Sequence, residues 1–204
     1  MPTLESSSAA PRIASTSARI EPLAPPYPSD IEAALTRLMP PGVPPLNLFR
    51  TLAHNPAALN TFAHNGALVF RLGSLDATHR EIMIQRTCAL CGAEYEWGVH
   101  AAFFGKRTNL EGERLAATLH GDAESPVWNP GEATLIRLAD ELHASHTISE
   151  PLWDALKERW TPPQIIELIV LAGFYHTVSY LVNGLGVELE AFGVRFPQAA
   201  RPDD

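Results

Sequence analysis

The side chains best suited to chemistry lie close together between residues 81 and 100. Glu96 and His100 are four residues apart, so a helix would place this carboxylate and this imidazole on one face. A carboxylate bonded to one ring nitrogen fixes the tautomer and leaves the other nitrogen as a base near neutral pH. Glu81 lies one predicted helix earlier, and a hairpin around Gly92 would bring it opposite the imidazole. Two carboxylates around one buried imidazole would form a proton-relay site.

Both acidic residues also have a purely structural interpretation. Glu96 and His100 could be a pair on a helix surface, which stabilises a helix by about 0.2–0.5 kcal/mol. Thr78 followed three residues later by Glu81 matches a capping box, in which the glutamate bonds to the backbone at the start of a helix. The spacing of these residues is compatible with either interpretation.

Two cysteines lie inside the same segment. Cys88 and Cys91 form a Cys-x-x-Cys pair, a spacing that suits reversible disulfide chemistry. Both fall near the predicted end of a helix, where the helix dipole disfavours a thiolate, although Arg86 could compensate in part. A zinc site would need two more ligands, and His143 and His146 are the matching doublet. Buried, inert thiols are the third interpretation.

Composition narrows the class of protein. The 204 residues fit one domain, and the formal net charge of −8 disfavours nucleic acid or an anionic membrane as the main partner. Two cysteines cannot form the disulfide framework of a small secreted domain, no stretch reaches the ~18 unbroken apolar residues of a membrane span, and no secretory signal is visible. The sequence therefore predicts a cytoplasmic protein. It contains no P-loop, no Gly-x-Ser-x-Gly and no His-Glu-x-x-His motif.

Apolar residues recur at helical spacing almost throughout the chain from Ser29 onward, so the predicted fold class is all-α. Caps and prolines set the ends of most segments, for example the Asn55-Pro56 pair and the run Thr161-Pro162-Pro163-Gln164. The expected helices cover residues 29–38, 48–52, 56–73, 78–91, 95–104, 130–143, 149–160 and 165–185.

The chain divides into two predicted tails and one domain. Residues 1–28 are rich in Pro, Ser and Ala, which predicts a tail that is flexible or lies over the surface, and residues 197–204 are a polar C-terminal tail. The domain is expected at 29–196. Its last helix is apolar on most sides, so it must be central or face another subunit. His176 on that helix is expected to be buried or at a pocket, more often as a core residue than as a ligand.

One segment of the chain resembles a known family. Gly92-Ala-Glu-Tyr-Glu-Trp-x-x-His100, with Arg80-Glu81 upstream, is similar to the carboxymuconolactone decarboxylase-like family, which shares its fold with the alkyl hydroperoxidase D (AhpD-like) proteins. Ala139-Asp140-Glu141-Leu142 and Asn183-Gly184-Leu185-Gly186 extend the likeness over residues 30–195. The resemblance implies an all-helical domain that assembles into a trimer or hexamer, with pockets for a small molecule near the subunit interfaces.

The resemblance also assigns roles to individual positions. In the peroxidase branch of this fold, a Glu, a Cys-x-x-Cys and a His form a thiol and proton-relay site. Matched by position, the Glu falls on Glu81 and the His on His100, whereas the two cysteine positions hold Ala93 and Glu96. The chain's own pair of cysteines lies five residues earlier.

Two enzymatic functions follow from these residues. In the first, Glu81, Glu96 and His100 carry out acid–base chemistry on a small organic acid or lactone, leading to decarboxylation or isomerisation, and need no metal or organic cofactor. In the second, Cys88 or Cys91 is the reactive thiol of a peroxidase, and Glu81 and His100 relay protons. A structural or small-molecule-binding homo-oligomer is the third possibility. The displaced cysteines favour the acid–base chemistry.

Overall fold

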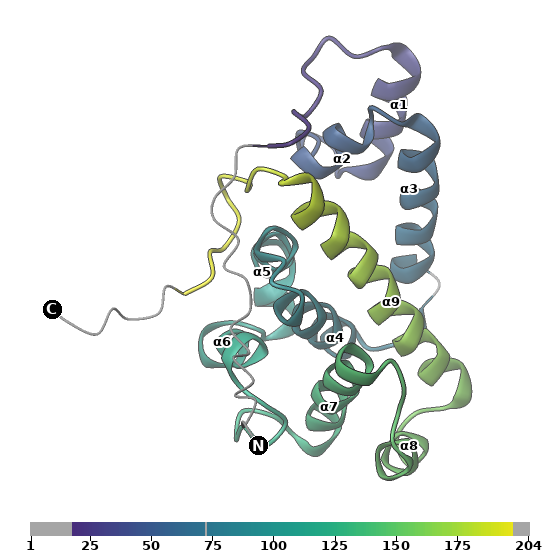
Figure 1. The fold of residues 1–204 in the computed structure, drawn as a ribbon, viewed down its shortest axis with the longest axis vertical. Coiled ribbons are helices and arrows are strands. Elements are labelled where there is room, and N and C mark those ends of the chain that lie inside the picture. Colours follow the sequence, from purple (N-terminus) through teal and green to yellow (C-terminus); the bar gives the residue numbers. More distant parts are fainter. Residues whose placement is uncertain (1–17, 72, 198–204) are drawn as a thin grey trace, which may run out of the picture.

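The computed structural model describes residues 18–71 and 73–197, and within them every regular element is a helix (Figure 1). The all-α prediction is therefore confirmed. Of the predicted tails at 1–28 and 197–204, residues 1–17 and 198–204 lie outside the described residues. The helices are α1 (Ser29–Leu38), α2 (Asn47–Leu52), α3 (Pro56–Arg71), α4 (Ala77–Leu90), α5 (Glu94–Thr108), α6 (Gly112–His120), α7 (Pro130–Ser145), α8 (Glu150–Lys157) and α9 (Pro162–Leu185).

Helix α4 is the centre of the domain. It packs against α5, α6, α7 and α9, which surround it in Figure 1. Ile82, Met83 and Ile84 are three successive residues of α4 with no exposed surface, so all sides of this part of the helix are covered. A helix that is covered on all sides has no solvent-facing side that would require polar residues. The polar residues that α4 buries are therefore candidates for a functional role.

Helix α9 combines a buried face with an exposed apolar one. Leu168, Leu171 and Val178 pack into the core, whereas Ile166 is 63% exposed and Val170 55% exposed. By length and composition alone α9 could cross a membrane, but a core helix meets the same criterion, and α9 packs against α3, α4, α5 and α8. That these exposed residues face another subunit stays a prediction.

The N-termini of α4 and α9 can be compared with the capping boxes that the sequence predicts there. The predicted capping box at the start of α4 is wrong, because Asp76 is the N-cap and its side chain accepts a hydrogen bond from the Thr78 backbone N–H at 2.8 Å. Glu81 is thereby released from a capping role. At the start of α9 the prediction is confirmed, since Gln164 Oε1 accepts a hydrogen bond from the Thr161 backbone N–H at 3.0 Å.

Two elements between residues 104 and 121 differ from expectation. Helix α5 continues through Gly105 to Thr108 and ends at Asn109, which adopts the left-handed conformation with φ 54°. Helix α6 was not anticipated, because its N-cap residue, Glu111, makes no side-chain cap hydrogen bond and the sequence shows no start signal there.

The described ends of the chain lie against the helical domain. Arg19 donates its backbone N–H to Leu185 O at 3.0 Å, and Leu23 O accepts a hydrogen bond from Arg50 Nε at 2.7 Å. At the other end, Val194 donates its backbone N–H to Gly98 O on α5 at 3.1 Å. Gly98 permits this close approach, because a Cβ there would overlap the Val194 carbonyl oxygen.

Candidate active site

A tight turn between α4 and α5 brings the predicted site residues together. Gly92 adopts φ +62°, a conformation that favours glycine, and Ala93 donates its backbone N–H to Cys88 O at 2.8 Å. The two helices therefore fold back on each other and pack along their lengths. As a result, Glu81 near the start of α4 faces His100 in the middle of α5.

The imidazole of His100 lies between two carboxylates. His100 Nδ1 is 2.7 Å from Glu81 Oε2, and His100 Nε2 is 3.3 Å from Glu96 Oε1. His100 is only 4% exposed and Glu81 1%, so the surface-pair interpretation is wrong. The other oxygen of Glu81, Oε1, lies 3.7 Å from Arg80 Nε. Glu96 has the most accessible side chain of the three.

This arrangement sets the charge of the imidazole. Burial alone would lower the pKa of His100, but the charge of Glu81 and the hydrogen bonds with Glu81 and Glu96 outweigh it and raise the pKa to about 10. At neutral pH, His100 is therefore an imidazolium that directs an N–H toward each carboxylate. The prediction that one of its nitrogens is a base near neutral pH is wrong, because a carboxylate lies beside each ring nitrogen and together they keep the ring protonated.

Tyr175 on α9 completes the group. Its hydroxyl oxygen lies 3.1 Å from His100 Nε2, and the two rings meet edge to face. Burial, followed by the charges of Glu96 and Glu81, raises the pKa of Tyr175 well above its usual value, so it stays a neutral phenol. Sequence analysis missed this residue and singled out His176 beside it. A tyrosine on an apolar helix carries no local signal that separates a core role from a site role.

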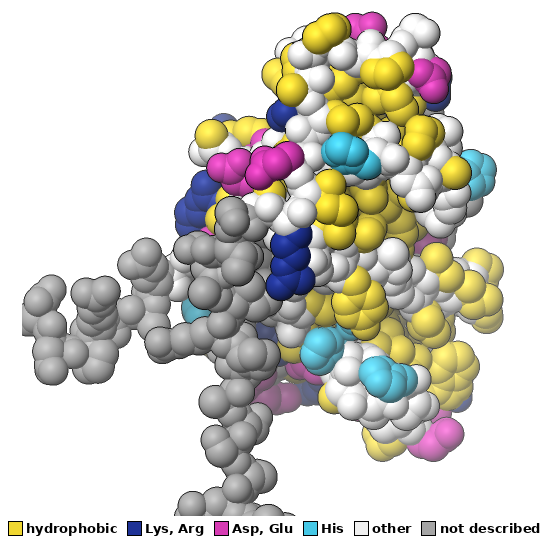
Figure 2. Space-filling view, turned by 45° about the horizontal axis from the view of Figure 1, so that its top comes forward, with side chains coloured by type: hydrophobic (Ala, Val, Ile, Leu, Met, Phe, Trp, Pro, Cys, Tyr) yellow, Lys and Arg dark blue, Asp and Glu magenta, His cyan; other side chains and the backbone are white. Residues whose placement is uncertain are grey.

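Glu96, His100 and Tyr175 border a cavity of about 840 Å³. Helices α1, α2, α3, α5 and α9 contribute to its lining, which is mainly aromatic and aliphatic, and Figure 2 shows hydrophobic side chains gathered over the α1–α3 end of the molecule. Glu96, His100 and Tyr175 supply polar groups to the lining, and Arg37 and Arg107 supply positive charge. A mostly apolar cavity with a few polar groups is the usual form of a small-molecule site.

Neither cysteine borders the cavity, although Cys88 is near enough to Glu96 and Glu81 for their charges to affect its thiol. Cys88 has no exposed surface, and burial together with the charge of Glu96 raises its pKa well above the usual value. Cys91 is the C-cap of α4 and is half-buried, and burial raises its pKa as well. Because the thiolate is the reactive form, these surroundings disfavour a reactive thiol at either position. Cys91 Sγ instead lies 3.9 Å from His143 Nδ1.

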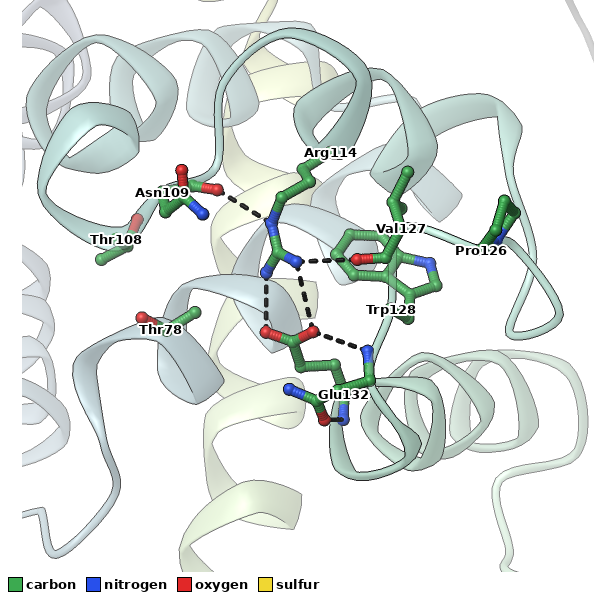
Figure 3. Close-up of a pocket in the computed structure, with 9 residues that line it drawn as sticks. Thr78, Thr108, Asn109, Arg114, Pro126, Val127, Trp128 and Glu132 are labelled. Atoms are coloured by element: carbon green, nitrogen blue, oxygen red, sulfur yellow. Dashed lines mark hydrogen bonds and ion pairs between the residues drawn. The ribbon is translucent and has the colours of Figure 1, made fainter.

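A second hollow, between α6 and the start of α7, is built around a satisfied ion pair. Arg114 points at Glu132, with a distance of 2.6 Å between Nη2 and Oε1, and also donates to the carbonyl oxygens of Asn109 and Val127 (Figure 3). Burial would raise the pKa of Glu132, but hydrogen bonds from Arg114 and from the Asn129 backbone outweigh it and lower the pKa. The charges that line this hollow are therefore already paired within the protein.

We expect Arg114→Met to reduce the free energy of unfolding by about 2 kcal/mol, because Glu132 would remain buried without its partner. Urea unfolding measures the loss. Arg137→Met is the matched control, since Arg137 pairs with Glu124 on the exposed surface and such pairs contribute about 0–1 kcal/mol. Equal losses in the two variants would contradict the structural role of the Arg114 pair.

Comparison with solved structures identifies the fold of the chain. No family model and no curated protein matches the sequence. Among solved structures, an uncharacterized peroxidase-related protein from Silicibacter sp. superposes with a TM-score of 0.70 at 16% identity, covering 82% of this chain and 88% of that one. A putative antioxidant defence protein AhpD from Agrobacterium tumefaciens gives a TM-score of 0.63 at 15% identity, over 69% of this chain and 95% of that one. The chain has the AhpD-like fold.

Proteins with this AhpD-like fold differ in the reactions that their names describe. The debrominase Bmp8 superposes with a TM-score of 0.68 at 14% identity, covering 85% of this chain and 92% of that one. The proteins of similar structure thus include a debrominase and peroxidase-related proteins, and at these identities the likeness shows the fold alone. The reaction must be argued from the residues of this AhpD-like chain itself.

Proposed function

We propose that the protein is an enzyme that moves a proton at the carbon next to a carbonyl group of a small organic acid or lactone, leading to decarboxylation or isomerisation. The observation that carries the proposal is the row of Glu81, His100 and Glu96, with the Tyr175 hydroxyl 3.1 Å from the same imidazole. Glu96, His100 and Tyr175 border the largely apolar cavity. Buried acids and bases with opposed charge states are the usual components of proton-transfer sites.

Each side chain has a distinct role in this proposal. Glu96 is the base, because it is a carboxylate with the most accessible side chain of the three and borders the cavity. It accepts the proton from the substrate carbon, and the electron pair of the broken C–H bond moves onto the carbonyl oxygen. The Nε2–H of His100 and the hydroxyl of Tyr175 stabilise that oxygen. Returning the proton from Glu96 to another carbon completes an isomerisation. In a decarboxylation, the electron pair of the C–CO2 bond moves onto the carbonyl oxygen as CO2 leaves, and the carbon then takes up a proton supplied by solvent.

Glu81 and the cavity wall set the conditions for this chemistry. Glu81 keeps the imidazole protonated and oriented, so it is a positioning residue. Arg37 and Arg107 offer positive charge for a substrate carboxylate, and the aromatic lining suits an unsaturated or cyclic carbon skeleton. A structure of a debrominase Bmp8 variant in complex with 2,3,4-tribromopyrrole supports the choice of a small ring, since that protein shares the fold.

The thiol peroxidase is the weaker alternative. Glu96 stands where the resemblance places a cysteine, and both cysteines of the chain lie in surroundings that raise their pKa. A peroxidase of this type would need one of them as a thiolate near His100.

Proton exchange tests the proposed function without knowledge of the natural product. We expect the full chain in D2O to speed C–H to C–D exchange next to the carbonyl, or CO2 release, for members of a panel of β-keto acids and unsaturated lactones. The expected gain is at least about 100-fold over buffer, measured by NMR. Cys88→Ser and Cys91→Ser should match the parent. No exchange across the panel, or dithiol-dependent peroxide consumption that Cys91→Ser abolishes, would contradict the proposal.

A further inference from the structure

A second group of reactive side chains lies away from the acid–base residues. Cys91 at the end of α4, His143 on α7 and His176 on α9 place one sulfur and two nitrogen atoms within 4.8 Å of one another. His143 Nδ1 is 3.1 Å from His176 Nε2 and 3.9 Å from Cys91 Sγ. All three residues are half-buried, so solvent has partial access to the group.

The protonation of the two rings is set by their neighbours. His176 Nδ1 lies 2.9 Å from the carbonyl oxygen of Ala172, and since a carbonyl only accepts, Nδ1 carries the hydrogen. In a neutral ring, Nε2 then presents its lone pair to the group. A ring N–H held by a backbone carbonyl is the usual arrangement of an imidazole that binds a metal through its other nitrogen. His143 Nδ1, 3.1 Å away, then donates its hydrogen to His176 Nε2 when no metal is bound.

We propose that Cys91, His143 and His176 form a Zn²⁺ site that is separate from the acid–base site. One thiolate and two imidazoles are preferred zinc ligands, and they leave a fourth position for water or another small ligand. In a tetrahedral zinc site the ligand atoms lie about 3.3–3.6 Å apart. The distances of 3.1 and 3.9 Å from His143 Nδ1 are within a few tenths of an ångström of that geometry.

Binding requires a simple exchange of protons. The Cys91 thiol releases its proton to solvent as the sulfur–zinc bond forms. His143, which donates from Nδ1 to His176 Nε2 without metal, moves that hydrogen to Nε2 through solvent, so that Nδ1 can bind the ion. One proton is released for each ion bound.

The helices that carry these ligands are already held in place. Asn183 on α9 donates from Nδ2 to Cys91 O at 2.9 Å, and Arg86 on α4 pairs with Asp140 on α7 at 2.6 Å. The ligands are therefore brought together before an ion binds, and the ion would link α4, α7 and α9. Bound zinc should raise the melting temperature, because a ligand that binds only the folded state stabilises it.

Metal titration of the reduced full chain tests the site. We expect one Zn²⁺ per chain in competition with a chromogenic chelator, and a thiolate-to-cobalt absorption band when Co²⁺ is used as a probe. Cys91→Ser should abolish the cobalt band. His143→Gln and His176→Gln should each weaken Zn²⁺ binding by about 100-fold or more, since loss of a supporting partner alone costs 10–100-fold.

Two neighbouring residues supply matched controls. By sequence spacing alone, Cys88 would pair with Cys91 and His146 with His143. Neither Cys88 nor His146 belongs to the group of Cys91, His143 and His176, so Cys88→Ser and His146→Gln are the controls. Both variants should bind Zn²⁺ and Co²⁺ as the parent does. Absence of stoichiometric binding in the parent, a cobalt band that survives Cys91→Ser, or an equal loss in Cys88→Ser would overturn the proposal. Proton exchange by the acid–base site is measured separately, so failure of either proposal is distinguishable from failure of the other.

Discussion

Glu96→Gln is expected to lower the rate of proton exchange by about 10²–10⁴-fold, the usual contribution of a positioned general base. The glutamine amide has nearly the same shape as the carboxylate and can still accept a hydrogen bond from His100 Nε2 through its oxygen. It cannot accept the substrate's proton. The loss should therefore appear in kcat, with KM changed little, in the NMR exchange assay.

Glu94→Gln is the matched control for this prediction. Glu94 lies two residues earlier on α5, and its Oε1 accepts a hydrogen bond from the Phe196 backbone N–H at 3.0 Å, which a glutamine oxygen can also do. Glu94 does not border the large cavity. Glu94→Gln should retain the parent rate. An exchange rate in Glu96→Gln within twofold of the parent would show that Glu96 is not the base.

Much of the α4–α5 hairpin could be predicted from the sequence because its determinants are local. The four-residue spacing of Glu96 and His100 fixes their common face on one helix. Gly92 marks the reversal, since its φ of +62° favours glycine. From these two facts the meeting of Glu81 with His100 follows, and the structure has it at 2.7 Å.

Other parts of the site depend on contacts that no local pattern records. Tyr175 reaches His100 from 75 residues away, and the cavity wall comes from α1, α2 and α3, whose positions are set by packing. The capping pattern of Thr78 and Glu81 was misleading for a related reason. Asp76 is a competing cap two residues before Thr78, and the choice between them depends on where the helix begins in the folded domain.

The histidines show the same distinction. The spacing of His143 and His146 suggested a doublet, yet His146 is the exposed C-cap of α7 and does not belong to the group with Cys91, whereas His176 pairs with His143. Because His143 and His176 are on different helices, only the folded structure reveals the pair.

The stability of the protein should fall as the pH rises from 6.5 toward 10. The pKa of His100 is about 10 in the folded protein and ordinarily 6.5 in an unfolded chain. Across this interval the folded state holds one proton that the unfolded state has released. The free energy of unfolding should therefore decrease by about 1.4 kcal/mol per pH unit, or about 3 kcal/mol from pH 7 to pH 9.5. Below pH 6.5 the contribution is fully present.

Urea unfolding of matched variants at several pH values isolates this effect from other titrating groups. His100→Gln should be less stable than the parent at pH 6.5, because the carboxylate of Glu81 loses its charged partner, and the difference should shrink as the pH approaches 10. His120→Gln, a change at an exposed histidine, should follow the pH dependence of the parent. A difference between the parent and His100→Gln that stays constant from pH 6.5 to 9.5 would mean that His100 holds no extra proton in the folded state. Glu96 would then face a neutral ring, and the division of acid and base roles between them would have to be reversed.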